Sequence, residues 1–90
     1  MIDATIFGFI VADVIVRPAP LRNPPPPGGL SLVDSITLTS GGNVCNVGMA
    51  MRKLGRAVAA AGLIGPDVLG PAVVESLKAA GIDVSAISRT

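Results

Sequence analysis

The stretch from residue 57 to residue 64, Ala-Val-Ala-Ala-Ala-Gly-Leu-Ile, is apolar from end to end. A continuous apolar run suits a strand that is covered on both faces, as in a parallel sheet. Segments with helical periodicity stand on either side of it, at about 44–54 and 71–80, and residues 84–88 can begin a further strand. This alternation of strands and helices predicts an α/β fold with a βαβ core segment over residues 41–90.

Both predicted helices have an apolar stripe and recognisable ends. The inward-facing residues are expected to be Val44, Val47, Met51 and Leu54 in the first helix, and Val73, Leu77 and Ala80 in the second. Asn43 is a candidate N-cap, and Gly55 and Gly81 stand where left-handed C-terminal caps are expected. Glu75 and Lys78 are spaced for an ion pair on the outer face of the second helix.

The N-terminal part predicts strands around an irregular loop. Residues 4–11 predict a buried strand, residues 13–17 a second one, and the alternation in residues 32–40 a half-exposed antiparallel strand. Residues 18–29 include four consecutive prolines, which cannot join a central strand and therefore predict an exposed loop. The loop is either a spacer or a proline-rich docking ligand, and the lack of a cation-bearing PxxP context favours the spacer. Residues 13–40 thus form a small β excursion.

The composition limits the classes of function. Half of the residues are hydrophobic and 14% are charged, which argues against disorder. So few charges predict either a large buried fraction or uncovered apolar surface, and the second would fit a fragment or a chain that docks onto a partner. The net charge is +1, and the one dense basic group, Arg52-Lys53-Arg56, is interpreted as the solvated end of a helix. Phe7 and Phe9 are the only aromatic residues, so we expect no nucleic-acid binding.

The chain has one cysteine, Cys45, and no histidine. This excludes an internal disulfide, zinc sites built from thiolates or histidines, and nucleophiles activated by a histidine within the chain. No metal site is therefore expected. Cys45 is predicted to be a small side chain packed in the interior. The N-terminus lacks the positive start of a signal peptide. The most apolar long stretch is interrupted by Pro66, Asp67 and Pro71, so we expect no membrane span and a cytoplasmic protein.

Two groups of residues fall where ligands bind in parallel α/β sheets, outside the carboxyl ends of strands. The first is Asp13, whose carboxylate can accept two hydroxyl hydrogen bonds, although an aspartate in a turn is often structural. The second is Gly41-Gly42-Asn43 followed by Asn46. Paired glycines at a helix N-terminus let a ligand approach the backbone, and the Asn46 amide suits sugar hydroxyls. The alternative is an ordinary strand-to-helix turn with Asn43 as its cap.

A third block, Gly65-Pro66-Asp67-Val68-Leu69-Gly70, has the glycine spacing of a phosphate loop. Pro71-Ala72 replace the Lys and Ser/Thr of that loop, so the block is not a Walker motif. No Gly-x-Gly-x-x-Gly occurs either, and a dinucleotide fingerprint is therefore absent.

In this order the blocks resemble the N-terminal part of the PfkB (ribokinase-like) family of carbohydrate kinases. The matching stretches are Gly8–Asp13, Thr39–Gly55, Gly62–Gly70 and Leu77–Asp83, and together they span nearly the whole chain. The second stretch is similar to the family's first signature, with two glycines, an asparagine, small residues and a closing Leu-Gly. The resemblance implies a doubly wound α/β domain with a small β lid, formed here by residues 13–40, which often pairs two subunits as a homodimer.

The resemblance also implies an activity. Kinases of this family use ATP and Mg²⁺ to phosphorylate a hydroxyl of a small-molecule sugar, and residues matching Asp13, Gly41, Gly42 and Asn46 hold that sugar. Their catalytic aspartate lies in a Gly-Ala-Gly-Asp motif near the C-terminus, which does not occur in this sequence. We therefore expect the chain to supply the sugar-binding half and lid of a kinase, to lack the nucleotide pocket and to be inactive alone.

Two departures and two alternatives accompany this prediction. Val11 stands where ribose-specific members carry an asparagine, and Asn43 where they carry a lysine, so the resemblance does not point to ribose. The short length leaves room for a non-catalytic module that dimerises through its lid or binds sugar. A generic α/β segment with coincidental glycines is the other alternative, and it predicts that Asp13→Ala and Asn46→Ala leave sugar binding unchanged.

Overall fold

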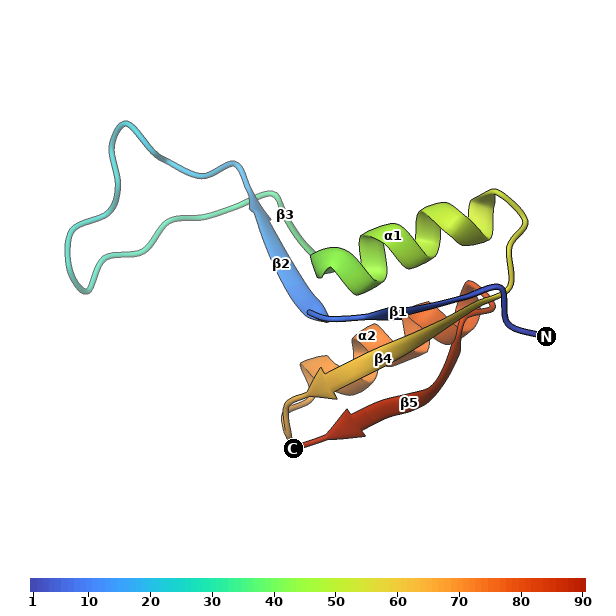
Figure 1. The fold of residues 1–90 in the computed structure, drawn as a ribbon. Helices are drawn as coiled ribbons and strands as arrows, with labels where there is room; N and C mark the ends of the chain where they lie inside the picture. Colours follow the sequence, from blue (N-terminus) through green and yellow to red (C-terminus); the bar gives the residue numbers. More distant parts are fainter.

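A computed structural model describes all of residues 1–90 (Figure 1). The chain forms strands and helices in the order β1 (Ala4–Phe7), β2 (Val11–Arg17), β3 (Ser35–Gly41), α1 (Gly42–Lys53), β4 (Val58–Ile64), α2 (Leu69–Ala79) and β5 (Asp83–Arg89). A three-stranded parallel sheet has the strand order β1-β4-β5, and β2 pairs with β3 in a separate antiparallel hairpin. The predicted α/β class and parallel sheet are confirmed.

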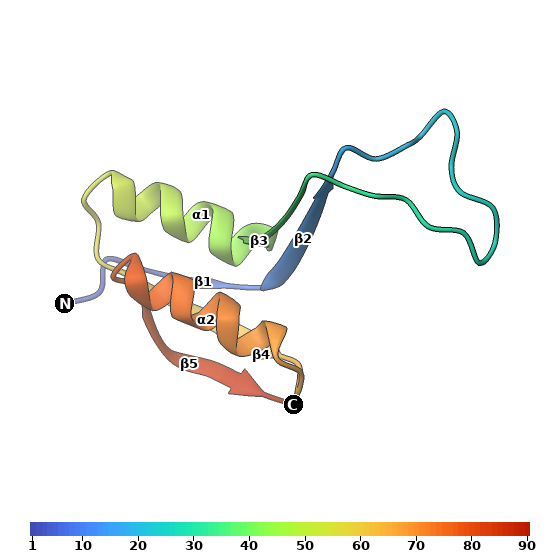
Figure 2. The same ribbon diagram turned by 180° about the vertical axis from the view of Figure 1, so that it is seen from behind.

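Both helices cover the same face of the parallel sheet. Right-handed crossovers that step in one direction across a sheet leave their helices on one side of it. One core cluster accordingly combines residues of both helices with residues of the sheet: Val44, Cys45, Val58, Ala60, Val73, Leu77 and Ile82. Figure 2 shows α2 in front of the sheet, with α1 beside it. On the opposite face Phe7 is 77% and Leu63 62% exposed, so residues 1–90 contain one helical layer of the sheet.

The N-terminal strands differ from the prediction in their limits. The strand expected over 4–11 is two strands, because β1 ends at Phe7, Gly8 has a φ of +154°, and β2 begins at Val11. The strand expected over 32–40 begins only at Ser35 and continues to Gly41. Its antiparallel pairing is confirmed, and the pairing sets Val11 opposite Gly41.

Helix α1 turns only part of its predicted apolar stripe to the sheet: Val44 is buried and Met51 packs partly buried against the core. Its buried residues are Val44, Cys45 and Gly48, whereas Leu54 is 78% exposed and Val47 is also exposed. The physical reason is close approach, since a Cβ at Gly48 would lie 3.4 Å from Cδ1 of Ile82. Small residues let the helix lie near the sheet, and the larger apolar residues are left at the edge.

Helix α2 follows the prediction on its inner face, where Val73 and Leu77 are buried. It begins at Leu69, earlier than the expected residue 71, because Oδ1 of Asp67 accepts hydrogen bonds from the backbone N–H groups of Leu69 and Gly70, both at 3.1 Å. These bonds satisfy donors that a helix N-terminus leaves free.

The ends and outer faces of both helices agree with the sequence. Gly55 and Gly81 each have a φ of +83° just past the helices, as expected for left-handed caps. Nζ of Lys78 lies 3.5 Å from Oε1 of Glu75, which confirms the ion pair. No helix in the structure combines the length and apolar character needed to cross a bilayer.

The β2–β3 hairpin projects away from the parallel sheet and has two unlike faces (Figure 1). Directly paired residues share a face, so one face is formed by Ala12, Val14, Val16, Ile36, Leu38 and Ser40. We call this the apolar hairpin face; Val14, Val16, Ile36 and Leu38 on it are exposed. The other face, which we call the polar hairpin face, is formed by Val11, Asp13, Ile15, Arg17, Ser35, Thr37, Thr39 and Gly41.

The segment that joins β2 to β3 lies outside both sheets and is exposed, as predicted for the proline-rich loop. The backbone N–H of Gly29 donates to the carbonyl oxygen of Pro26 at 2.8 Å, and Gly28 has a φ of +77°. A proline followed by a residue with positive φ at the centre of such a turn is typical of type II. The proline run therefore ends in a chain reversal.

Candidate functional site

The β1–β2 connection, the end of β3 and the start of α1 meet at one point. The backbone N–H of Val44 donates to the carbonyl oxygen of Phe9 at 3.2 Å, which joins the first turn of α1 to this connection. Gly42 has a φ of +81°, and a Cβ there would lie 2.5 Å from the same Phe9 oxygen. Both the backbone conformation and the available space therefore require glycine at residue 42.

The side chain of Asn43 forms hydrogen bonds across this junction and does not cap the N-terminus of α1. Its Oδ1 accepts a hydrogen bond from the backbone N–H of Phe9 at 2.8 Å, and its Nδ2 donates to the carbonyl oxygen of Phe7 at 3.4 Å. Gly41 takes the cap position without a side-chain bond. Gly8 leaves room for the amide, because a Cβ there would lie 2.5 Å from Nδ2 of Asn43. Sequence reasoning missed this role, since nothing local signals a partner 34 residues away.

Asp13 lies on the polar hairpin face, directly against Gly41. A Cβ at Gly41 would be 2.5 Å from Oδ2 of Asp13, so a larger residue there would displace the carboxylate from this position. The carboxylate oxygens of Asp13 accept no hydrogen bond from the chain, unlike those of Asp3, Asp67 and Asp83. An exposed carboxylate without an internal partner is free to accept hydrogen bonds from a ligand.

Asp13 also acts on the N-terminus of α1. The first turn of this helix contains no acidic residue, and Gly41 is its cap position. A negative charge close to a helix N-terminus is favourable, because the free N–H groups there carry a partial positive charge. Asp13 therefore supplies from β2 the charge that the helix itself lacks.

Asn46 is the fourth predicted site residue. It follows Gly42 by one turn on α1, and residues four apart lie on the same side of a helix. Its side chain is exposed and makes no hydrogen bond within the chain. The structure thus brings Asp13 and Gly41 into contact, sets Gly42 next to them, and leaves the Asn46 amide free on the helix above.

Cys45 lies beneath this junction and is buried, as predicted. Burial raises the pKa of its thiol above the ordinary value, and the charge of Asp13 adds to the rise, while Ser40 and the Val11 backbone act in the opposite direction. Removal from water disfavours the thiolate, which is the reactive form of cysteine.

Cys45 is therefore expected to resist modification in the folded chain. We predict that at neutral pH a disulfide reagent such as DTNB reacts about tenfold or more slowly with the folded chain than with the chain in denaturant. The release of the coloured thiolate measures both rates. Equal rates in the two states would contradict the burial of Cys45.

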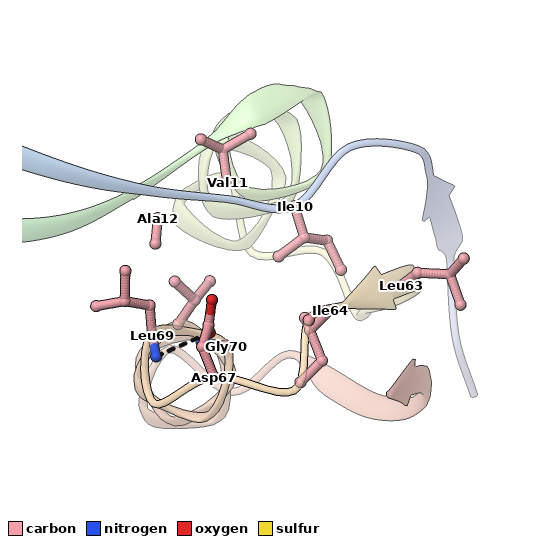
Figure 3. A pocket seen from close by; sticks show the side chains of 10 residues that line it. Ile10, Val11, Ala12, Leu63, Ile64, Asp67, Leu69 and Gly70 are labelled. Atoms are coloured by element: carbon pink, nitrogen blue, oxygen red, sulfur yellow. Dashed lines mark hydrogen bonds between the residues drawn. The ribbon is translucent and has the colours of Figure 1, made fainter. Parts of the chain in front are cut away.

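The two larger cavities of the molecule lie elsewhere, and most of the residues that line them are hydrophobic. One, of about 310 Å³, is lined by the side chains of Ile10 and Ala12 together with the end of β4 and the start of α2. Figure 3 shows that Val11, between them, points to the other side of β2. The charged side chain at this cavity is Asp67, whose Oδ1 is engaged in capping α2. A second cavity, of about 360 Å³, has no polar side chain in its lining. The second cavity therefore offers no side chain that could hydrogen-bond a polyol, whereas the first has Asp67 in its lining.

Two features that could hold a metal ion or a phosphate are a cluster of ligating side chains and the Gly65–Gly70 block. No three or more histidine, cysteine, aspartate or glutamate residues come together in the structure. The Gly65–Gly70 block, which has the glycine spacing of a phosphate loop, leads into α2 and is closed by the Asp67 cap. It therefore presents no lysine and no open cradle of N–H groups for a phosphate.

A parallel α/β sheet with a projecting hairpin, and an aspartate against paired glycines at its root, has the architecture of the ribokinase-like kinases. The sequence profile described as "pfkB family carbohydrate kinase" matches residues 1–90, and the chain belongs to this family. No curated protein sequence matches the chain.

Solved structures support the assignment. The chain is similar to a PfkB protein from Polaromonas sp. JS666, with 25% identity and a TM-score of 0.76 over 99% of this chain and 27% of that one. A fructokinase with bound ATP from Xylella fastidiosa shows 28% identity and a TM-score of 0.73, and the match covers 97% of this chain and 23% of the fructokinase. A microbiome-derived acarbose kinase shows 32% identity and a TM-score of 0.71, and the match covers 99% of this chain and 28% of the acarbose kinase. The chain spans about a quarter of the length of these structures.

Proposed function

We propose that the chain supplies the sugar-binding part of an ATP-dependent carbohydrate kinase. Asp13, Gly41, Gly42 and Asn46 hold the hydroxyl groups of a sugar or related polyol. The observation that carries this proposal is the Asp13 carboxylate, which lies against Gly41 and has no hydrogen-bond partner in the chain. Family membership and the similarity to fructokinases support it.

The geometry suits a polyol for two reasons. A carboxylate can accept hydrogen bonds from two neighbouring hydroxyls, and charge-assisted hydrogen bonds are stronger than neutral ones. Glycine at 41 lets the Asp13 carboxylate lie against the backbone at the start of α1, and glycine at 42 lets that backbone lie against the Phe9 carbonyl, so the two glycines position the carboxylate that would bind the sugar. The Asn46 amide both donates and accepts, which matches hydroxyl groups that do the same.

The proposal divides the reaction between parts of the enzyme. Phosphoryl transfer depends mainly on positioning and on electrostatic stabilisation of the transferred group. Residues 1–90 orient the sugar, and the β2–β3 hairpin acts as a lid that excludes water. ATP, Mg²⁺ and the catalytic aspartate belong to other parts of such a kinase, and the family's Gly-Ala-Gly-Asp motif does not occur in residues 1–90.

The division is tested with the chain itself. We expect residues 1–90 to bind a neutral sugar in calorimetry and to form no ADP when sugar, ATP and Mg²⁺ are supplied together. ADP formation that depends on the sugar would contradict the division of labour. A chain that is folded by circular dichroism yet binds no member of a panel of hexoses, pentoses and nucleosides would contradict the proposed site.

We further propose that the apolar hairpin face pairs two subunits. Val14, Val16, Ile36 and Leu38 form an exposed apolar surface that extends beyond α2. Exposed apolar surface of this kind is typical of interaction sites. In a two-fold dimer the same face meets its own copy. This arrangement also fits the alternative of a module that only dimerises. The calorimetric titration with neutral sugars separates that module, which binds no sugar, from the sugar-binding part of a kinase.

Leu38→Lys is expected to dissociate this dimer. Burial of a leucine side chain contributes about 1.5–3 kcal/mol, and a two-fold interface loses it twice, so the dissociation constant should rise about 100-fold or more. Thr37→Lys adds the same charge on the polar hairpin face and serves as the control. Sedimentation equilibrium measures the mass in solution of each of the two variants. If the two variants have the same mass as the unaltered chain, the apolar hairpin face is not the interface.

A further inference from the structure

We infer that Asn43 is a positioning residue for the sugar site, because its amide determines where the Asp13 carboxylate lies relative to the start of α1. The inference rests on the proposed function and concerns how that site is held in shape. Asn43 acts through the backbone of the β1–β2 connection. The residues that carry the inference lie where β2 and β3 leave the body of the chain (Figure 1).

The β2–β3 hairpin is joined to the rest of the chain at two places. Residues 8–10 lead from β1 into β2, and Gly41 at the end of β3 leads directly into α1. Asp13 is the third residue of β2 and follows Val11, which pairs directly with Gly41. The position of the Asp13 carboxylate over α1 therefore depends on how these two places lie relative to one another.

The Asn43 amide connects the two places directly. Its Oδ1 accepts from the backbone N–H of Phe9 at 2.8 Å, and its Nδ2 donates to the carbonyl oxygen of Phe7 at 3.4 Å. The next residue of α1, Val44, donates its backbone N–H to the carbonyl oxygen of Phe9 at 3.2 Å. Two consecutive residues of α1 thus hold both peptide groups of Phe9, and with them the direction in which the chain enters β2.

Gly8 is fitted to the same amide. A Cβ at residue 8 would lie 2.5 Å from Nδ2 and 2.6 Å from Oδ1 of Asn43. The amide therefore packs directly on the backbone that precedes Phe9. A single methyl group at residue 8 is enough to push the amide away from its two partners, so the contact can be disturbed from either side.

The hairpin also touches α2, through a contact of another kind. A cavity of about 70 Å³ remains between the two elements, and its lining includes Leu38 and Ser40 of β3 and Ala72 and Val73 of α2. Packing that leaves a gap permits small shifts, whereas hydrogen bonds weaken steeply when their angles change. The bonds of Asn43 are therefore better suited than this contact to set the direction of the hairpin.

Loss of the amide should loosen the junction without unfolding the chain. Asn43 is exposed, so water can replace its hydrogen-bond partners, and the net contribution of such bonds to stability is modest. The bond between Val44 and Phe9 remains when the amide is removed. What is lost is a fixed geometry, and a binding site depends on its groups being held to a fraction of an ångström. A positioning role therefore predicts a loss of affinity out of proportion to the loss of stability.

The test compares Asn43→Ala with Asp3→Ala. Oδ2 of Asp3 accepts from the backbone N–H of Ala57 at 2.8 Å, so it too is an exposed side chain that holds distant backbone, but it lies before β1 at the opposite end of that strand. Calorimetry measures the affinity for whichever neutral hexose, pentose or nucleoside binds the unaltered chain most tightly, and urea denaturation measures stability. Asn43→Ala should bind this sugar about tenfold more weakly, and Asp3→Ala should bind it unchanged.

Gly8→Ala tests the same contact without altering Asn43. The added Cβ should displace the amide and weaken sugar binding about as much as Asn43→Ala does. In the Asn43→Ala background no amide is left to displace, so adding Gly8→Ala should change the affinity less than about twofold. Losses that multiply to about 100-fold in the double variant would show that the two residues act independently, and would contradict the inference.

The outcomes separate the inference from the proposed function. If Asn43→Ala binds the sugar as tightly as Asp3→Ala, the inference is wrong and the sugar site stands. If both variants lose affinity in proportion to their stability, or if neither Asn43→Ala nor Gly8→Ala folds, Asn43 only supports the fold and the inference is also wrong. If the unaltered chain is folded and binds no sugar, the proposed function fails together with the inference.

Discussion

Replacement of Asp13 by asparagine is expected to weaken sugar binding by about 30-fold or more. Hydrogen bonds to a charged group contribute about 1.5–3 kcal/mol each, and the carboxylate can accept two from neighbouring hydroxyls. Asparagine has the same shape, so the packing against Gly41 is retained while the charge and one acceptor are lost. Calorimetric titration of the variant with the best-binding neutral sugar measures the effect.

Asp34→Asn is the matched control for this prediction. Asp34 is exposed, precedes β3, and takes part in the hairpin through its backbone N–H, which donates to the carbonyl oxygen of Arg17 at 2.8 Å. The substitution removes the same charge and leaves that backbone bond in place, so sugar affinity should not change. Equal affinities of the Asp13 and Asp34 variants would show that Asp13 does not bind the sugar.

Gly42→Ala is expected to destabilise the chain by about 2–5 kcal/mol. The left-handed backbone costs a residue with a Cβ about 1–2 kcal/mol. The added carbon would also lie 2.5 Å from the Phe9 carbonyl oxygen, so the backbone at the junction must shift, which adds a cost of overpacking of about 1–3 kcal/mol. This is a large part of the stability of a small domain. Urea denaturation followed by circular dichroism measures the free energy of unfolding.

Gly55→Ala separates the two contributions. Gly55 has a φ of +83°, close to the +81° of Gly42, yet a Cβ at residue 55 would have nothing within 4 Å. Gly55→Ala should therefore lower the free energy of unfolding only by the cost of the left-handed backbone, about 1–2 kcal/mol. A Gly42 variant no less stable than the Gly55 variant would mean that the start of α1 does not lie closely on the Phe9 carbonyl.

The parts of the fold that follow from local pattern were predictable from the sequence. The apolar run of β4, the inner face of α2 with Val73 and Leu77, and the glycine caps each depend on neighbours within a few residues. The inner face of α1 was predicted only in part: Val44 is buried and Met51 packs against the core, whereas Val47 and Leu54 are exposed, because periodicity weighs the size of apolar side chains. The contact with the sheet instead depends on the smallness of Gly48.

The candidate site was predictable in its residues and not in its contacts. Asp13, Gly41, Gly42 and Asn46 were identified through the resemblance to the family, and local pattern alone left structural alternatives open. The approach of Asp13 to Gly41 depends on the β2–β3 register, which spans the proline-rich loop and has no local signal. Asn43 illustrates the same limit, since its partners Phe7 and Phe9 belong to the β1–β2 connection.

The most direct test of the sugar site is a titration of the ¹⁵N-labelled chain with a neutral sugar, followed by amide chemical shifts. The account predicts saturable shifts at the backbone amides of Asp13, Gly41 and Gly42 and at the side-chain amide of Asn46. It also predicts that the apolar cavity, represented by Ile10 and Leu69, responds little. Shifts confined to that cavity, or no saturable shifts in a folded chain, would contradict the placement of the sugar at Asp13.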